Sequence, residues 1–445
     1  MINRQIASSL VFLFLIFIST KIQAQNDTLR IGTRELFELA EKQSTQLQLS
    51  KLAIDESAAQ TADTKTAKLP MLETDLSLGY ISNIGIIGLN SGMPDGWYDM
   101  PHFSNSFSIQ AAYLLYSGGK INNAISMSKI QEEISHINYE KSAQGVKLIL
   151  AGYLLDLHTM MQQRKVYESN IQQSKALLKK IENRYKAGLV LKSDYVRNEL
   201  LVANFELALL KLNNRIKIWN HRMIEALNLP DSTIIFPVKP LNPDIMQGEH
   251  PQNMERLKLE ASTNNPENKI SALQIQLAEK NIKMVKANQL PQVSLYAANN
   301  LNRPFIYDIP ALDLYANIFT AGIKINYNLG SLYNNKHKKQ KANIQLMEAK
   351  TADRISKEHI NQAVHESFVN FQEAKDQQVS IEKENELAHE NYRRVSNSYQ
   401  EQMALITDLM DASNSLLTSQ LRLEQAKTQI TFSYYQILKT TGNLK

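Results

Sequence analysis

The sequence contains no cysteine among its 445 residues. Without cysteine the chain has neither a disulfide framework nor a thiolate metal site, and it cannot carry the acylated N-terminal cysteine of a bacterial lipoprotein. An excess of charge is also missing, because 49 basic and 44 acidic residues give a formal net charge of only +5. That excess is too small to indicate nucleic acid as a partner.

Long apolar runs are missing too, apart from one near the N-terminus. Leu10–Ile18 is an unbroken apolar run, and it is far shorter than the about 20 residues that a membrane-spanning helix requires. Arg4 before it and Ile22-Gln23-Ala24 after it predict a signal peptide over residues 1–24, with a buried N-terminal helix as the alternative. Its removal, with Arg4 and Lys21, leaves 47 basic against 44 acidic residues, a net charge of about +3. The mature chain is therefore expected outside the cytoplasm, and if it enters a membrane, strands must cross it.

Proline is absent from two long tracts, and most of the second tract lacks glycine as well. All 12 prolines lie outside residues 102–229 and 311–445, and Ser331–Thr441 contains no glycine either. Both residues interrupt helices, so their absence predicts helices of unusual length. At about 1.5 Å per residue, a helix from Gly119 to Gly188 would reach ~100 Å.

Within each tract, apolar and small residues recur at steps of mostly three and four. The two rows are Leu201, Phe205, Ala208, Leu212, Trp219, Met223 and Ala226, and Leu416, Ser419, Leu423, Ala426, Ile430, Ser433 and Ile437. This spacing is typical of a coiled-coil seam. Each tract breaks once, at Arg184–Tyr195 and at Ser398–Leu409, which align without a gap. Gly188 is a candidate helix C-cap, and Ser193 or Asp194 a candidate N-cap, so each tract is predicted to fold into a helical hairpin.

Four segments alternate between apolar and polar residues, as strands do when their two faces meet different surroundings. They are predicted at about 71–82, 106–116, 292–301 and 321–329. Each has about the 9 to 11 residues of a tilted membrane strand, with a half-buried soluble sheet as the alternative. Four strands cannot close a barrel, and lipid does not tolerate an open edge, so membrane insertion would require strands from several identical chains. Irregular connections, Ser82–Asn105 and Asn302–Phe319, separate the strands of each pair.

Part of the chain recurs. Ala40–Pro70 aligns without a gap on Ala261–Pro291, and each copy is followed in the same order by a strand, an irregular stretch, a second strand, a glycine and a long helical tract. This order predicts an internal duplication. The predicted organisation is a first repeat at 25–230 with its hairpin tip near 188–193, a linker at 231–251, and a second repeat at 252–445 with its tip near 402–407.

Short signatures stand at the joints of this layout. They are Leu-Pro before each first strand, Tyr116-Ser117-Gly118-Gly119 and Tyr327-Asn328-Leu329-Gly330 before each long helix, and the tip Arg184–Leu189 with Asp194 after it. With them, the whole mature chain resembles the TolC-like outer-membrane efflux proteins. The resemblance implies a mixed α/β membrane protein, a homotrimer whose chains give four strands each to a 12-stranded β-barrel. Long antiparallel helices would form a coiled-coil barrel in the periplasm.

The resemblance also implies a function and partners. It implies a passive exit duct for efflux or type I secretion, set among the lipids of the outer membrane and docked to a periplasmic adaptor and an inner-membrane pump. We expect no cofactor and no metal, and the small net charge argues against nucleic acid as a partner.

Particular residues match the family's functional positions. Asp408 and Asp411 occupy the place of an acidic pair at the periplasmic gate, and their i, i+3 spacing puts both carboxylates on one side of a helix. A solvated helix face is the alternative. Gly188 and Leu189 match the tip that contacts the adaptor.

Two positions depart from the family pattern. Ala404 stands where some relatives have an arginine that latches the inner tip to a neighbour, and Gln402-Met403 replaces a glycine-containing signature. Tyr399 and Asp194 remain as a candidate latch between the two coils. We expect the closed state to be held differently in this chain.

An enzyme and a soluble periplasmic coiled-coil scaffold are the competing classes. The nine histidines are scattered, none forms a metal-binding pair, and neither a P-loop nor a dinucleotide fingerprint is present. His158 and His365-Glu366 lie in helical tracts, where they are expected to face solvent or a seam. The chain is therefore not expected to be an enzyme. A scaffold would wash off membranes with salt, whereas a barrel would require detergent.

Overall fold

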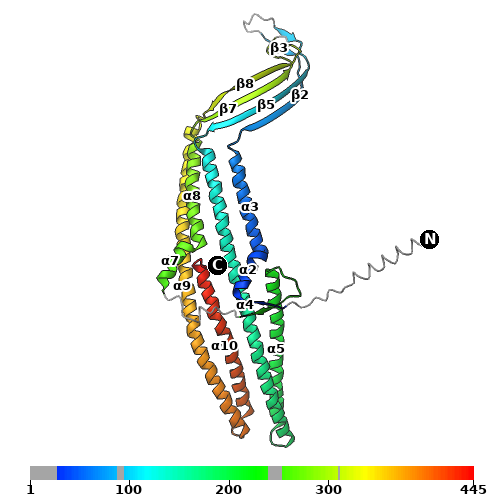
Figure 1. The fold of residues 1–445 in the computed structure, drawn as a ribbon, viewed down its shortest axis with the longest axis vertical. Helices are drawn as coiled ribbons and strands as arrows, with labels where there is room; N and C mark the ends of the chain where they lie inside the picture. Colours follow the sequence, from blue (N-terminus) through cyan, green and yellow to red (C-terminus); the bar gives the residue numbers. More distant parts are fainter. Residues whose placement is uncertain (1–27, 88–94, 239–252, 309–310) are drawn as a thin grey trace, which may run out of the picture. The chain divides into compact units, whose positions relative to one another are not determined.

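The computed structural model describes residues 28–87, 95–238, 253–308 and 311–445, and the chain is mostly helical (Figure 1). The predicted signal peptide and most of the predicted linker lie outside these residues. The chain forms two compact units, which we call the hairpin unit and the sheet unit. The hairpin unit is Met1–Leu49, Ser142–Asn265 and Ile360–Lys445, and the sheet unit is Ser50–Lys141 and Pro266–His359.

Four long strands make one antiparallel sheet in the sheet unit. They are β2 (Met71–Tyr80), β5 (Phe103–Tyr116), β7 (Gln292–Arg303) and β8 (Ala316–Asn326), in the order β2-β5-β7-β8. β5 and β8 begin earlier than the alternation indicated. For β5 the reason is that Ser104, Asn105 and Ser106 are polar in succession, yet their backbones pair with β2 opposite Gly79, Leu78 and Ser77.

Apolar side chains are in register across this sheet. Leu76 stands opposite Phe107, while Tyr113 stands opposite Leu295 and Leu295 opposite Ile323. These side chains are exposed in the single chain, at 71% for Leu76 and 64% for Ile323. Within the described residues, β2 and β8 each pair on one side only. The sheet thus has a largely apolar face and two open edges, which mark a surface for lipid or protein.

Both connections predicted to be irregular contain ordered contacts. In the first, β3 (Ile84–Ile86) and β4 (Gly96–Tyr98) form a short antiparallel hairpin that the sequence did not predict. In the second, Arg303 makes two hydrogen bonds to Asp313, at 2.7 and 3.0 Å, and its guanidinium lies 5.6 Å from the ring centre of Tyr315. Because the guanidinium fork fits a carboxylate, this pair fastens the start of the connection to its end.

Helices complete the sheet unit. They are α3 (Thr45–Thr66) from residue 50 on, α8 (Pro266–Ala287), and the first parts of α4 (Lys120–Lys186) and α9 (Ser331–Gln400). Ile134 of α4 is buried against Leu273 of α8, and Ser271 Oγ donates to Asp353 Oδ1 at 2.6 Å. With 67 and 70 residues, α4 and α9 each rise by about 100 Å, as the absence of proline from both tracts predicted.

The hairpin unit is built on α5 (Lys192–Ala226), α10 (Ile406–Thr440) and the remaining parts of α4 and α9. The two rows of residues predicted as seams are all buried or half-buried, which confirms the helical periodicity. None of the helices in the described part of the chain combines the length and hydropathy needed to cross a membrane.

Short elements surround the core of this unit. They are β1 (Thr28–Ile31), α2 (Thr33–Gln43), β6 (Ile234–Pro237) and α7 (Met254–Asn264). β1 and β6 pair in parallel, and neither strand was predicted. Their pairing joins segments about 200 residues apart, so no local pattern indicates it. Leu36, Leu154, Met223 and Ile235 are fully buried in the core that results.

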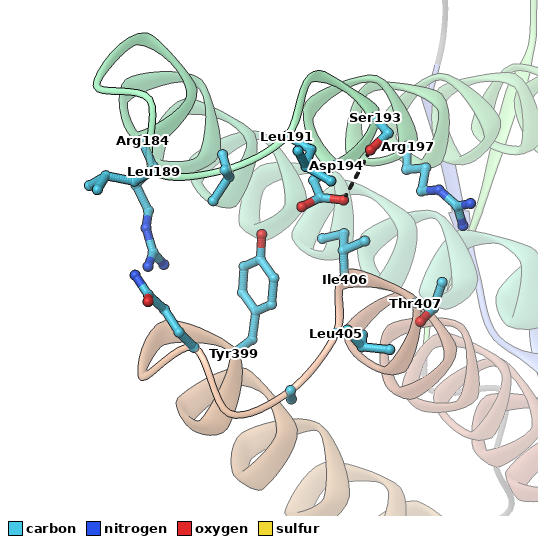
Figure 2. A pocket seen from close by; sticks show the side chains of 13 residues that line it. Arg184, Leu189, Leu191, Ser193, Asp194, Arg197, Tyr399, Leu405, Ile406 and Thr407 are labelled. Carbon is cyan, nitrogen blue, oxygen red and sulfur yellow. Dashed lines mark hydrogen bonds between the residues drawn. The ribbon is translucent and has the colours of Figure 1, made fainter.

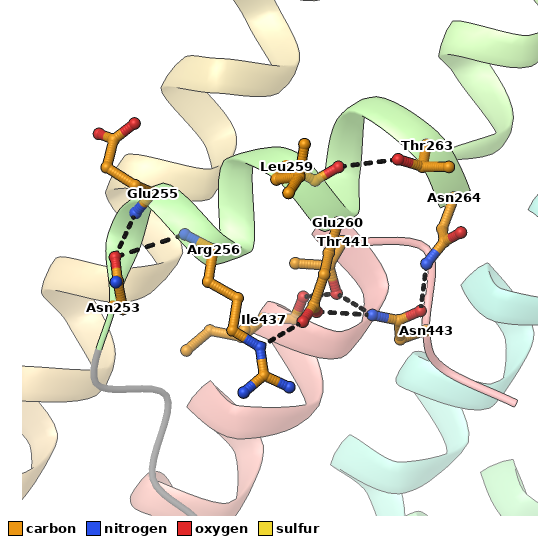
Figure 3. Close-up of polar contacts among 10 residues, drawn as sticks. All are labelled: Asn253, Glu255, Arg256, Leu259, Glu260, Thr263, Asn264, Ile437, Thr441 and Asn443. Carbon is orange, nitrogen blue, oxygen red and sulfur yellow. Dashed lines mark hydrogen bonds and ion pairs between the residues drawn. The ribbon is translucent and has the colours of Figure 1, made fainter.

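The C-terminal residues pack against α7 (Figure 3). Asn443 Nδ2 donates to Glu260 Oε2 at 3.0 Å, and Asn264 Nδ2 donates to Asn443 Oδ1 at 2.9 Å. Gly442 has φ +78°, and a Cβ there would lie 2.6 Å from the carbonyl carbon and oxygen of Asn264. Glycine is therefore required at this turn, which buries Leu444 in the core.

Candidate functional site: the tips of the two hairpins

The tip between α4 and α5 is closed by a glycine. Gly188 has φ +75°, its N–H donates to the carbonyl of Tyr185 at 2.9 Å, and Leu189 N donates to the carbonyl of Arg184 at 2.9 Å. This pair of bonds satisfies the last carbonyls of α4 and requires a left-handed residue. The prediction that Gly188 ends this helix is confirmed.

The predicted N-cap of α5 was wrong. Leu191 is the N-cap, in an extended conformation, while Ser193 and Asp194 lie in the first turn. The turn at Gly188 is short enough that α5 begins at Lys192, so Ser193 and Asp194 are already inside the helix. Since leucine has no side-chain acceptor, the first N–H groups of α5 receive no capping bond from Leu191.

The tip between α9 and α10 has the same closure without a glycine. Gln402 has φ +64°, its N–H donates to the carbonyl of Tyr399 at 3.1 Å, and Met403 N donates to the carbonyl of Ser398 at 2.8 Å. Leu405 is the N-cap of α10, as Leu191 is of α5. The two tips therefore share one backbone turn.

Both tips present exposed apolar side chains. Leu189 and Leu191 are 60% and 70% exposed at the first tip, and Met403 and Leu405 are 72% and 69% exposed at the second. A Cβ added at Gly188 would meet open space. Exposed large apolar residues at a narrow tip are suited to a protein partner.

Asp408 and Asp411 lie on the exposed side of α10, with Leu409 and Ala412 buried beneath them. The structure therefore puts both carboxylates on one helix face, as their spacing predicted. Asp408 Oδ2 also accepts a hydrogen bond from Leu405 N at 3.1 Å, so this carboxylate stabilises the start of the helix.

A cavity of about 420 Å³ lies between the two tips (Figure 2). It is lined by Arg184, Leu189, Val190, Leu191, Ser193, Asp194, Arg197, Tyr399, Gln402, Ala404, Leu405, Ile406 and Thr407. Burial raises the pKa of Tyr399 and the charge of Asp194 raises it further, whereas Arg184 lowers it. Tyr399 and Asp194 thus line one cavity, but the Tyr399 hydroxyl forms no hydrogen bond within the described residues.

The histidines named from the sequence do not form a site. His158 is half-buried and its pKa is lowered, chiefly by burial, while His365 is exposed with Nδ1 3.3 Å from Met254 Sδ. Across residues 28–87, 95–238, 253–308 and 311–445, no group of three or more histidine and acidic side chains is arranged to hold a metal ion.

Comparison with protein families gives one match. The family described as outer membrane efflux protein matches residues 36–229 and 259–443, which is most of the chain. No curated protein sequence matches.

Several solved structures share the fold. VceC of Vibrio cholerae has a TM-score of 0.73 at 14% identity, covering 92% of this chain and 96% of VceC. CmeC of Campylobacter jejuni has a TM-score of 0.74 at 13% identity, covering 92% of this chain and 85% of CmeC. MtrE of Neisseria gonorrhoeae in its open state has a TM-score of 0.71 at 13% identity, covering 93% of this chain and 89% of MtrE. All three are described as outer membrane proteins or channels, and at these identities the likeness shows the fold alone.

Proposed function

Because the chain belongs to the outer membrane efflux protein family, it is an outer-membrane exit duct of an efflux system with a periplasmic helical part, and we propose that three copies of it make one duct. The observation that carries this proposal is the four-stranded sheet, whose apolar face is exposed and whose β2 and β8 edges are open. Joining β8 of one copy to β2 of the next would leave no edge in lipid. Three copies would give a 12-stranded barrel, within the range of known membrane barrels.

The helices would continue this assembly as a coiled-coil tunnel. The repeated tip turn, with Gly188 and Gln402 at matching places, supports the proposed internal duplication. In this arrangement the signal peptide at 1–24 directs export and is removed. The scaffold alternative has no observation in its favour, because a soluble scaffold would not leave a broad apolar sheet face exposed.

The tips would receive the other components of the system. Gly188 and Leu189 would contact a periplasmic adaptor that links the duct to an inner-membrane pump. Two observations support this contact. Leu189 is 60% exposed, and a Cβ added at Gly188 would meet open space. Because glycine has no side chain, a partner can approach the backbone there closely. Tyr399 and Asp194 would form the latch when their side chains close across the cavity that they both line.

Asp408 and Asp411 would form the gate. Three copies with two exposed carboxylates each would give six acids around one throat, where their field favours cations. Mutual repulsion of these acids would oppose closure. The buried contacts of Leu409 and Tyr399 would therefore have to hold the tip shut.

Planar-bilayer conductance of the purified protein tests the gate. Replacing Asp408 and Asp411 by Asn should lower the cation selectivity and weaken block by Gd³⁺ added from the periplasmic side. Glu373 and Asp376 are the matched control, because they are also exposed and three apart on one helix. Their replacement by Gln and Asn should leave both quantities unchanged.

Two results would contradict the proposal at different points. If the gate variant and the control behave alike, Asp408 and Asp411 form only a solvated helix face. Native mass measurement in detergent tests the assembly separately, because a monomer that stays soluble without detergent would refute the trimeric barrel.

A further inference from the structure

The cavity between the tips contains a polar group that the protein does not satisfy. Tyr399 is 7% exposed, and its hydroxyl has no hydrogen-bond partner within the described residues. Leaving a buried hydroxyl unpaired costs about 1–3 kcal/mol, and few buried polar groups in folded proteins remain so. Figure 2 shows this hydroxyl pointing into the space between the hairpins, on the side of Asp194. The cavity thus offers a donor without an acceptor.

Two arginines line the same cavity without a partner of their own. Within the described residues, neither the Arg184 nor the Arg197 guanidinium makes a hydrogen bond or an ion pair. In Figure 2 they stand on opposite sides of Tyr399 and Asp194, with Arg184 on the side of Tyr399. A guanidinium presents its donors in a planar fork that matches the two oxygens of a carboxylate.

Two helices also begin at the cavity. Leu191 and Ser193 at the start of α5, and Leu405 and Ile406 at the start of α10, are among its lining residues. Neither leucine N-cap supplies a side-chain acceptor to the first turn. The N-terminal N–H groups and the positive ends of both helix dipoles therefore add to the field of the arginines.

Charge sets the class of ligand. Arg184 and Arg197 carry two positive charges and Asp194 one negative charge, so the titratable groups of the cavity sum to +1. A monoanion balances that charge, whereas a dianion such as phosphate would leave the cavity with a net charge of −1 and would be repelled more strongly by Asp194. We propose that the cavity binds one carboxylate, which accepts hydrogen bonds from the Tyr399 hydroxyl and the Arg184 guanidinium.

This ligand would join the two hairpins, because Arg184 belongs to α4 and Tyr399 to α9. Ala404 also lines the cavity, and its methyl side chain cannot make such a link. Binding requires only the hairpin unit. The consequence for closing the duct rests on the proposed function, whereas the binding itself does not.

Thermal unfolding of the mature protein in detergent tests binding, followed by the helical circular dichroism signal. Sodium acetate replaces sodium chloride at constant ionic strength and pH 7. A ligand that binds only the folded state raises the unfolding temperature with a saturating dependence on its concentration. We expect a saturable rise with acetate for the wild type and for Arg393→Gln, which removes an exposed arginine of α9 outside the cavity.

Two variants should abolish the rise. Tyr399→Phe removes only the hydroxyl, and since that hydroxyl is unpaired, the variant should be at least as stable as the wild type without acetate. Arg184→Gln removes the guanidinium. A saturable acetate effect that persists unchanged in both variants would overturn the proposal.

Asp194→Asn should strengthen acetate binding, whereas the other two variants should abolish it. Removing the negative charge should lower the half-saturating acetate concentration by roughly 3- to 10-fold. If this variant instead weakens the acetate effect, the carboxylate does not share the cavity with Asp194 and the proposal fails.

Two sources can supply a carboxylate, and two arms separate them. One arm uses acetate, and the other uses a tripeptide with blocked ends that carries one glutamate. Saturation by acetate indicates a small free carboxylate, and saturation by the peptide alone indicates an acidic side chain of a protein partner. Absence of a saturable effect in both arms refutes the site. The trimer measurement is independent, so failure of this site and failure of the duct assembly are distinguishable.

Discussion

The two hairpin tips have the same backbone turn but bury their tyrosines differently. The gapless alignment of the tips pairs Tyr185 with Tyr399 and Tyr195 with Leu409. At the first tip Tyr185 stays 38% exposed and stacks on Tyr195, with ring centres 6.1 Å apart. At the second tip Tyr399 is 7% exposed and Leu409 is 1% exposed in a shared apolar cluster. At the second tip, the presence of Leu409 at the position of Tyr195 thus accompanies the burial of Tyr399.

Truncating these paired positions should have the largest effect. Leu409→Ala removes a fully buried side chain from the cluster, so we expect a loss of about 2–5 kcal/mol. Tyr195→Ala removes a half-buried ring and should cost clearly less. Chemical denaturation followed by circular dichroism in detergent measures both. Equal losses would show that the second tip is not more tightly packed than the first.

Helix extent and burial were predictable because they depend on local composition. Proline and glycine placement predicted α4 and α9, and the steps of three and four predicted which residues are buried. The pairing of β1 with β6 was not predictable, since only four residues of each strand take part and they meet through the fold of the whole unit. The sequence did not predict the earlier start of β8 for a related reason: backbone pairing continues where side-chain alternation stops.

At the candidate site, the residues were predictable and their environment was not. Gly188 indicated its own conformation, but a glutamine rarely adopts positive φ, so Gln402 gave no such signal. Its turn can be inferred only from the alignment with the first tip. The unpaired hydroxyl of Tyr399 depends on packing between α4, α9 and α10, which no sequence pattern encodes.

Exchanging the residues with positive φ should have an intermediate effect of opposite sign at the two tips. Gly188→Ala places a side chain at φ +75°, which costs about 1–2 kcal/mol. Gln402→Gly relieves φ +64°, and because glycine also gains entropy when unfolded, the net stabilisation should stay below about 1 kcal/mol. The same denaturation experiment measures both changes. If Gln402→Gly destabilises the protein, contacts of the glutamine side chain outweigh the backbone strain.

The smallest effect should be a dependence on alkaline pH that distinguishes the second tip. Burial, followed by the charge of Asp194, raises the pKa of Tyr399 above its ordinary value of 10.0. A group whose pKa is higher in the folded state contributes stability that is complete below its unfolded pKa and is lost as the pH rises through the folded pKa. The unfolding temperature of the wild type should therefore fall from about pH 10 upward, and that of Tyr399→Phe should fall less steeply.

Part of the decline should remain in Tyr399→Phe, because burial also raises the pKa values of Tyr167, Tyr392 and Tyr435. Asp194→Asn should reduce the slope in the same direction but by less, because it removes only the second cause. Parallel declines for the wild type and Tyr399→Phe would mean that the phenol is not confined in the cavity, and that the two tips differ less than their packing indicates.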